Sequence, residues 1–335
     1  MKILLLTFII LLLSASCRPQ ANEQKLDEIF NTTYWGPIIS KGDNRPDFDR
    51  KKDNLDRFLV SLFYRIPAGE FMKKSGWTQE MYDSKVRFLK EKGWLKASDD
   101  KLIPTVFIVS GEIGNQLYEF AKPLSEAIAR SIEESIPSIK AKFKDENLNN
   151  IYNFDEMSFL VLSDVLLDNW QIMEMESSFL KQENRPERHG KFYYAAVMEN
   201  SGDGYEPFRI YGNQSGKIND STWLNIYGNN RIIANENLAN KHFQDSVLAN
   251  CLRTSPELYR YFEEIAADFK PKLLKILEEK RDYSMEVFRK TGYADQIRFE
   301  EFFIWWYHFI YTEATNILVE KKILKLPETG NFYYH

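Results

Sequence analysis

Residues 88–95 read FLKEKGWL, and this stretch predicts the end of a helix followed directly by the start of a strand. Gly93 ends the helix, because glycine adopts the left-handed backbone of a helix C-terminus without steric cost. Trp94 then opens a run that is typical of a β-hairpin, with a turn at residues 98–101 and a second strand from Leu102 to Val109. The stretch therefore predicts a helix followed by a hairpin.

Two further helical patterns precede this one. Asp53-Asn54 can cap a helix from Leu55 to Ile66, and Pro67 suits the first turn of a short helix from Ala68 to Lys74. Thr78 caps the third helix, which runs to Gly93. Three helices and a hairpin in this order resemble a winged helix over about sixty residues.

The resemblance implies a surface on the third helix that could enter the DNA major groove, where its basic side chains are Lys85, Arg87, Lys90 and Lys92. The same helix carries three acidic side chains, Glu80, Asp83 and Glu91. A net charge of about +1 is small for a surface that must neutralise several phosphates. We therefore expect a structural or protein-binding module, with nucleic acid an unlikely partner.

The first sixteen residues predict export. Lys2 precedes an apolar run from Ile3 to Leu13, and Ser14-Ala15-Ser16 are small. Eleven apolar positions are too few for a membrane span, which needs ~20 residues. Residues 1–16 are therefore interpreted as a signal peptide.

Cys17 follows the small residues directly, and Leu13-Ser14-Ala15-Ser16-Cys17 resembles the lipobox of bacterial lipoproteins. That resemblance implies fatty acylation of Cys17, palmitate included, and attachment to a membrane. Ordinary cleavage after Ser16 is the alternative, because small residues before the cut also suit a general signal peptidase. The second cysteine, Cys251, lies in an apolar helical context that is typical of a buried free thiol.

The length of 335 residues suggests about two domains, and 44% hydrophobic residues are enough to form their cores. This composition excludes a disordered chain, and the net charge of −5 gives no overall attraction for nucleic acid. We expect a tether and irregular docking segment at 17–50, then a winged-helix-like domain at 51–145. Its last part is a long helix in which Pro123 and Pro137 produce kinks or an end.

The remaining region, 150–335, is expected to be a mixed helical domain. Its first segment, Asp155 to Leu180, is rich enough in apolar residues to be a buried helix or helix pair. Asp164 and Asp168 lie four positions apart in it, on one helix face. Together with His189 they could form an acid/base or metal constellation. The alternative is a solvated stripe with an ion pair, which we favour because no metal-ligand spacing is present.

Aromatic and β-branched runs predict an antiparallel sheet at about 191–233. Such a sheet could hold a sugar or a peptide by stacking and hydrogen bonding. The candidate binding residues are Arg188, Tyr193, Tyr194 and Trp223.

The C-terminal third is expected to be helical. Ser255 and Pro256 start one helix, and a final helix, apolar almost all round, begins near Arg298. We expect His308 within it to be buried and hydrogen-bonded. Residues 323–334 suggest a second, shorter hairpin.

These patterns together predict an α+β fold that is mainly α. No nucleophile elbow, two-histidine zinc motif or phosphate loop is present, so we expect no cofactor or metal. The same absence favours a protein that is not an enzyme but leaves enzymatic activity undecided. The leading hypothesis is a lipid-anchored, extracytoplasmic binding or structural protein of a bacterial cell envelope. Its expected partners are the membrane and either an envelope protein or a small polar ligand. The alternatives are an envelope hydrolase using Asp164, Asp168 and His189, and a winged-helix DNA-binding protein.

Overall fold

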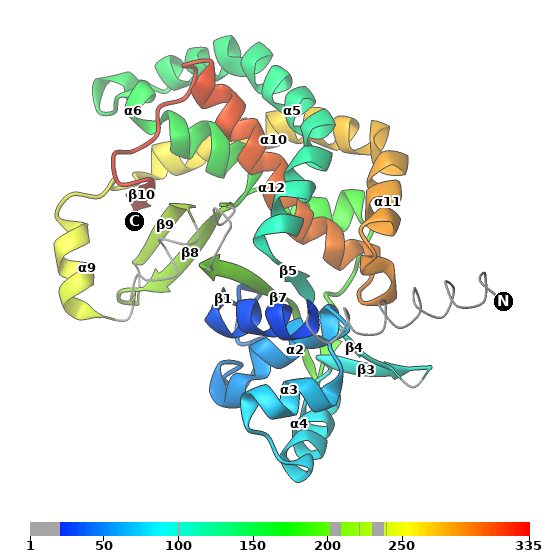
Figure 1. Cartoon of the computed structure of the whole chain (residues 1–335). Coiled ribbons are helices and arrows are strands. Elements are labelled where there is room, and N and C mark those ends of the chain that lie inside the picture. The colour runs from blue at the N-terminus through cyan, green and yellow to red at the C-terminus, as the bar shows by residue number, and fades with distance from the viewer. Residues whose placement is uncertain (1–20, 100, 202–208, 221, 230–237, 239) are drawn as a thin grey trace. The chain divides into compact units, whose positions relative to one another are not determined.

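The computed structural model describes residues 21–335 except 100, 202–208, 221, 230–237 and 239. The signal peptide and Cys17 therefore lie outside the described residues. The chain divides into two compact units (Figure 1). Unit 1 comprises the described residues of 1–111, 184–207 and 295–297, and unit 2 comprises those of 112–183, 208–294 and 298–335. Helices predominate over small, largely antiparallel sheets, so the predicted α+β fold that is mainly α is confirmed.

Unit 1 contains the predicted succession of three helices and a hairpin. Its elements are η1 (Lys52–Asn54), α2 (Leu55–Phe63), α3 (Ala68–Ser75), α4 (Gln79–Glu91), β3 (Leu95–Ser98) and β4 (Lys101–Pro104). Thr78 caps α4, since its side chain accepts a hydrogen bond from the Met81 N–H at 3.2 Å. Gly76 ends α3 with a φ of 76°, a left-handed conformation that glycine adopts freely. The local sequence thus determines these element boundaries.

Unit 1 also contains a five-stranded sheet, which has β7 (Lys191–Ser201) at its centre. β1 (Thr33–Trp35), β2 (Ile38–Ser40) and β6 (Glu187–Arg188) pair with β7 in the antiparallel sense, and β5 (Phe107–Val109) pairs with it in parallel. The tether expected at 17–50 is therefore wrong for most of its length. Residues 21–31 are helical, and the next segment supplies two strands of the sheet.

The second strand expected for the hairpin, Leu102 to Val109, is divided into β4 and β5. β4 ends at Pro104, which has no N–H to donate to a longer ladder. The next residues, from Val106 to Val109, are buried and extend along β7 instead. Burial of this apolar run decides the division, because continuing the hairpin would leave the run in water.

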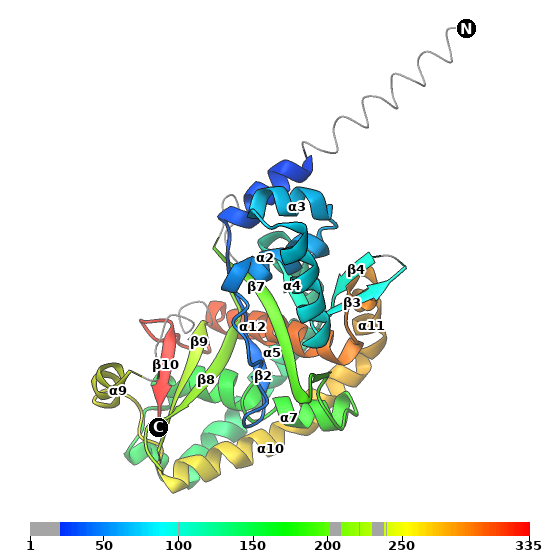
Figure 2. The same cartoon turned by 90° about the horizontal axis from the view of Figure 1, so that it is seen from below.

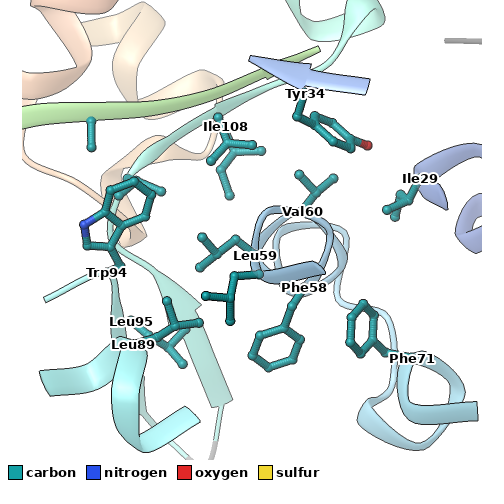
Figure 3. Packing of buried hydrophobic residues seen from close by; sticks show 14 of the residues in the cluster. Ile29, Tyr34, Phe58, Leu59, Val60, Phe71, Leu89, Trp94, Leu95 and Ile108 are labelled. Atoms are coloured by element: carbon teal, nitrogen blue, oxygen red, sulfur yellow. The ribbon is translucent and has the colours of Figure 1, made fainter. Parts of the chain in front are cut away.

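The buried side chains of unit 1 surround α2 (Figure 3). Phe58 of α2 contacts Phe71 of α3, with ring centroids 5.1 Å apart, and Leu59 and Val60 point towards the sheet. From the other segments come Ile29, Tyr34, Leu89, Trp94, Leu95 and Ile108. This core joins the N-terminal helical residues to the predicted three-helix unit.

Unit 2 is mainly helical. Its helical elements are α5 (Gly111–Asp145), η2 (Leu148–Asn150), α6 (Phe154–Phe159), η3 (Leu160–Val165), α7 (Ile172–Glu174), η4 (Met175–Phe179), α9 (Lys241–Leu248), α10 (Pro256–Glu279), α11 (Arg281–Lys290), η5 (Tyr293–Asp295) and α12 (Phe299–Glu320). Ser255 caps α10 by accepting a hydrogen bond from the Leu258 N–H at 3.2 Å. In the part of the chain that the structure describes, no helix combines the length and apolarity needed to cross a membrane.

The long helix α5 continues through both prolines, so of the two expected effects, a kink or an end, neither proline produces an end. Each proline removes one backbone donor from the helix. The side chains of Leu117, Ala121, Leu124, Ile128 and Ile132 are all buried at helical spacing. Burial of this continuous apolar face stabilises the helix across Pro123 and Pro137.

A three-stranded antiparallel sheet completes unit 2, in the order β10–β9–β8. β8 is Tyr211–Lys217, β9 is Trp223–Asn229 and β10 is Asn331–Tyr334. The single sheet expected at 191–233 is therefore divided, with β7 in unit 1 and β8 and β9 in unit 2. The hairpin expected at 323–334 is wrong as well, because β10 pairs with β9, about a hundred residues earlier in the chain.

Candidate functional site

Two adjacent carboxyl groups are enclosed in unit 2. Asp164 lies in η3, a π-helical segment, and Asp168 follows four residues later. The N–H of Asp168 donates to the Asp164 carbonyl at 2.9 Å, which keeps the two residues on consecutive helical turns. Their exposed fractions are 0% and 5%. The interpretation that we favoured, a solvated stripe, is therefore wrong.

Hydroxyl and amide groups hold the Asp164 carboxylate. The Tyr334 hydroxyl donates to Asp164 Oδ2 at 2.8 Å, and Asn213 Nδ2 donates to the same oxygen at 3.1 Å. Asn213 Nδ2 also lies 3.0 Å from the Tyr334 hydroxyl, to which Asn169 Nδ2 donates at 3.3 Å. Strands β10 and β8 thus meet at one carboxylate oxygen, and the turn after η3 supports the Tyr334 hydroxyl that binds it.

Further tyrosines surround the pair. Tyr227 of β9 bonds to Ser163 at 2.5 Å, and Ser163 bonds to Thr315 of α12 at 2.6 Å. Tyr311 donates to the Tyr211 carbonyl at 2.6 Å, and Tyr307 donates to the Leu167 carbonyl at 2.8 Å. These neighbours are uncharged, and no lysine, arginine or histidine among the described residues forms a reported ion pair with either carboxyl.

Burial is the main cause of the unusual ionisation of the pair. It raises the pKa of Asp164 to about 7, while the hydrogen bonds from Tyr334, Asn169 and Asn213 act in the opposite direction. Burial also raises the pKa of Asp168 well above its usual range, and the charge of Asp164 raises that pKa further. The pair therefore retains a proton at neutral pH and titrates as a coupled unit.

One oxygen of each carboxyl has no hydrogen-bond partner among the described residues. These atoms are Asp164 Oδ1 and Asp168 Oδ2. An unpaired charged oxygen in the interior is costly, whereas a protonated one is much less so. Their position agrees with a pair that retains a proton.

A line of polar side chains extends from the pair towards solvent along β8 and β9. Ser215 Oγ lies 3.2 Å from Asn213 Oδ1 and 2.5 Å from Asn225 Oδ1, and the Ser215 side chain is exposed. This line gives Asp164 a hydrogen-bonded connection to the surface. Sequence reasoning did not single out Asn169, Asn213 or Tyr334, because Asn213 and Tyr334 come close to Asp164 and Asn169 only in the folded chain.

His189 belongs to unit 1 and lies in the turn between β6 and β7, with a φ of 51° and an exposed side chain. The two aspartates are enclosed within unit 2. The structure thus brings Asp164 and Asp168 together within unit 2, whereas His189 is part of unit 1.

The candidate binding residues are also divided between the units. Arg188 is buried in unit 1, where its guanidinium donates to the carbonyls of Tyr193 at 2.6 Å and of Thr105 at 2.7 Å. Tyr193 and Tyr194 are buried too, and the Tyr193 hydroxyl accepts a hydrogen bond from Trp94 at 2.9 Å. Trp223 in unit 2 is 53% exposed. Of the four, Trp223 alone offers a side chain to solvent for stacking.

A shallow surface depression of about 590 Å³ lies elsewhere in unit 2. Its lining includes the amides of Asn149, Asn150 and Asn153, beside Lys140 and Lys144. No predicted site residue lines it. Within the described ranges, no group of three or more histidine, cysteine or acidic side chains is arranged to hold a metal ion.

Comparisons of the chain with family models, with curated proteins and with solved structures found no match. The function must therefore be argued from the residues themselves.

Proposed function

We propose that the protein is a lipid-anchored, extracytoplasmic binding or structural protein of a bacterial cell envelope. The observation that carries the proposal is the N-terminal sequence, in which a short apolar run ends at small residues and Cys17 follows at once. Two or three acyl chains hold a protein stably at a bilayer, whereas one chain alone gives marginal binding. The anchor is thus the acylated Cys17.

The folded body supports a binding or structural role more than a catalytic one. Asp164 and Asp168 are enclosed, and the only histidine proposed to act with them is an exposed residue of the other unit. A general acid or base must come within hydrogen-bond reach of its substrate. The hydrolase alternative therefore gains no support from this arrangement. The binding role is assigned to a small polar ligand or an envelope protein.

The DNA-binding alternative is weakened by ion pairs on the winged-helix-like part. Lys85 of α4 pairs with Asp53, and Lys92, which follows α4, pairs with Asp47 at 2.7 Å. Two of the four basic side chains named for DNA contact are thus already neutralised within unit 1. A phosphate-binding surface needs several free cations.

Two measurements on protein purified from a bacterial host test the anchor. We expect mass spectrometry of the mature N-terminus to find an acylated Cys17, and detergent phase separation to place the protein in the detergent-rich phase. A Cys17→Ser variant should move to the aqueous phase. The matched control is Cys251→Ser, which removes the half-buried thiol of α9's C-terminal turn and should leave partitioning unchanged. The proposal would be refuted if Cys17 of the mature wild-type protein were unmodified, or if the wild-type protein were recovered in the aqueous phase.

A further inference from the structure

The chain between the anchor and the folded body is very short. Only residues 18–20 separate Cys17 from Ala21, where the described helix begins. Four consecutive Cα steps span at most ~14 Å even when fully extended. Whatever conformation residues 18–20 adopt, the first described residue of unit 1 remains within that distance of an anchored Cys17.

Helix 21–31 is firmly packed on unit 1, so it does not act as extra tether. Leu26 and Ile29 are buried in the unit 1 core. Asn22 Nδ2 donates to Glu70 Oε1 of α3 at 3.2 Å, and Asp27 forms an ion pair with Lys74. The Lys25 ammonium lies 4.5 Å from the centroid of the Tyr64 ring. Unwinding the helix would expose both apolar side chains to water.

The same contacts show which end of unit 1 lies beside the anchor. Asn22 lies beside Glu70, and Asp27 lies beside Lys74, so helix 21–31 and α3 run in the same direction. The start of α3, including Gly69, is therefore next to the start of helix 21–31. β2 pairs with Tyr193–Ala195 and β1 with Met198–Ser201, so the residues after β2 lie at the opposite end of β7 from β1. Figure 2 shows α3 and β2 at opposite ends of unit 1.

The geometry points to a membrane-facing end of unit 1, formed by the starts of helix 21–31 and α3 and held against phospholipid headgroups. This inference rests on the lipid anchor proposed above and adds an orientation to it. Lys41, in the turn after β2, is at the end that faces away from the bilayer.

Charge on the two helices that form this end is nearly balanced. The two helices carry four acidic side chains, Glu23, Asp27, Glu28 and Glu70, and three basic ones, Lys25, Lys73 and Lys74. An anionic leaflet attracts a protein surface in proportion to its excess of lysine and arginine. We therefore attribute the contact between unit 1 and the headgroups to the short tether. The extent of that contact should be equal in zwitterionic and anionic vesicles.

Site-specific quenching tests the orientation. The acylated full chain, with Cys251→Ala, is reconstituted in phosphatidylcholine vesicles that carry a nitroxide on the headgroup, and a fluorophore is attached at Gly69→Cys or Lys41→Cys. Gly69 has no atom within 4 Å of an added Cβ and needs no positive φ, and Lys41 is exposed, so both positions accept a label. Since the tether reaches only ~14 Å, quenching at 69 should exceed quenching at 41 by about threefold or more.

A lengthened tether provides the control. A Gly/Ser insert of about 20 residues after Arg18, with a mean span of roughly 25 Å, should reduce quenching at 69 towards the value at 41. Equal quenching at the two positions in protein that does enter the detergent phase would overturn the orientation and leave the anchor intact. Protein that stays in the aqueous phase overturns the anchor itself, and with it the orientation. A clear excess at 69 that the insert abolishes supports the inference.

Discussion

Tyr334 of β10 donates a hydrogen bond of 2.8 Å to Asp164 of η3, 170 positions earlier in the chain. This bond joins the last strand of the described sheet to the π-helical segment that holds the buried carboxyl pair. π-helical turns are rare overall, but many of those that occur lie at functional sites. There they position a side chain that a regular helix would turn away. The stability of β10 and the ionisation of Asp164 should therefore depend on each other.

Asp168→Asn should stabilise unit 2 above neutral pH. Burial raises the pKa of each aspartate in the folded state, to about 7 for Asp164 and well above its usual range for Asp168. The stability that the pair contributes is therefore complete below the unfolded pKa of about 4 and is lost as pH rises through the raised folded-state pKa values. Asparagine cannot ionise, so we expect a gain of about 1–3 kcal/mol at pH 8 and little change at pH 4. Thermal unfolding of the wild type and the variant at pH 8 and pH 4 measures this change in stability.

The control for that substitution is Asp145→Asn, because Asp145 is exposed. Its unfolding temperature should differ little from that of the wild type at either pH. A lower stability of Asp168→Asn than of the wild type at pH 8 would contradict the burial argument.

Tyr334→Phe should make the Asp164 carboxyl harder to ionise. The hydroxyl of Tyr334 stabilises the charged form, so its loss should move the pKa of Asp164 above about 7. We expect a loss of about 1–2 kcal/mol of stability, because a buried acceptor loses its donor. Carboxyl carbon chemical shifts followed by NMR report the pKa directly. Tyr259→Phe, at an exposed position of α10, should leave that titration unchanged.

His308→Leu should make the protein less sensitive to mild acid. His308 is buried in α12 and its Nδ1 lies 2.8 Å from the Ile304 carbonyl, which confirms the expectation of a buried, hydrogen-bonded histidine. Burial lowers its pKa to about 4, so the unfolded state binds more protons between pH 6.5 and 4 and stability falls as pH is lowered through that window. A shift from 6.5 to about 4 corresponds to a loss on the order of 3 kcal/mol.

Denaturant titrations of wild type and His308→Leu at pH 7 and pH 4.5 check this difference. His242→Leu, at an exposed position in the first turn of α9, is the matched control and should retain the wild-type dependence. If His308→Leu lost as much stability on acidification as the wild type, burial of a neutral imidazole would not be the cause.

Gly228→Ala should release β10 from the sheet. A Cβ at position 228 would lie 2.5 Å from the Gly330 carbonyl oxygen and would also collide with Asn331. Because backbone atoms cannot swing aside, we expect a loss of about 1–3 kcal/mol and faster proteolytic cleavage after residue 325. Gly69→Ala, where no atom lies within 4 Å of the new Cβ, should be neutral or slightly stabilising. Equal cleavage rates for the two variants would contradict the predicted collision.

Patterns confined to neighbouring residues were sufficient for many of the helices. They were not sufficient for helix 21–31, which was expected to be a tether, or for the cap of α2, where Asn54 makes no capping hydrogen bond. Thr78 and Ser255 cap α4 and α10 as their sequence context predicts, and the apolar residues of α12 are buried almost all round. Capping depends on atoms three residues apart, and helical periodicity on residues within two turns, so both are visible in sequence. Strand partners were not predictable in this way, because the single sheet expected at 191–233 is shared between the units.

The candidate site, too, was only partly predictable from sequence. Spacing placed Asp164 and Asp168 on one helix face, but only the fold shows that both are enclosed and that Tyr334 and Asn213 bind one of them. Arg188, Tyr193 and Tyr194 were expected to bind a ligand, and the fold buries all three instead. Aromatic and charged residues look alike in sequence whether they pack or bind.

The amino-acid sequence by itself determined helices such as α4, α10 and α12, the caps at Thr78 and Ser255, the mainly α class and the expectation of an anchor at Cys17, since each depends on residues close together in the chain. Tertiary structure alone decided the strand partners, the burial of the carboxyl pair and the packing of helix 21–31 on the unit 1 core. These features depend on which distant segments exclude water from one another, and that is a property of the folded chain as a whole.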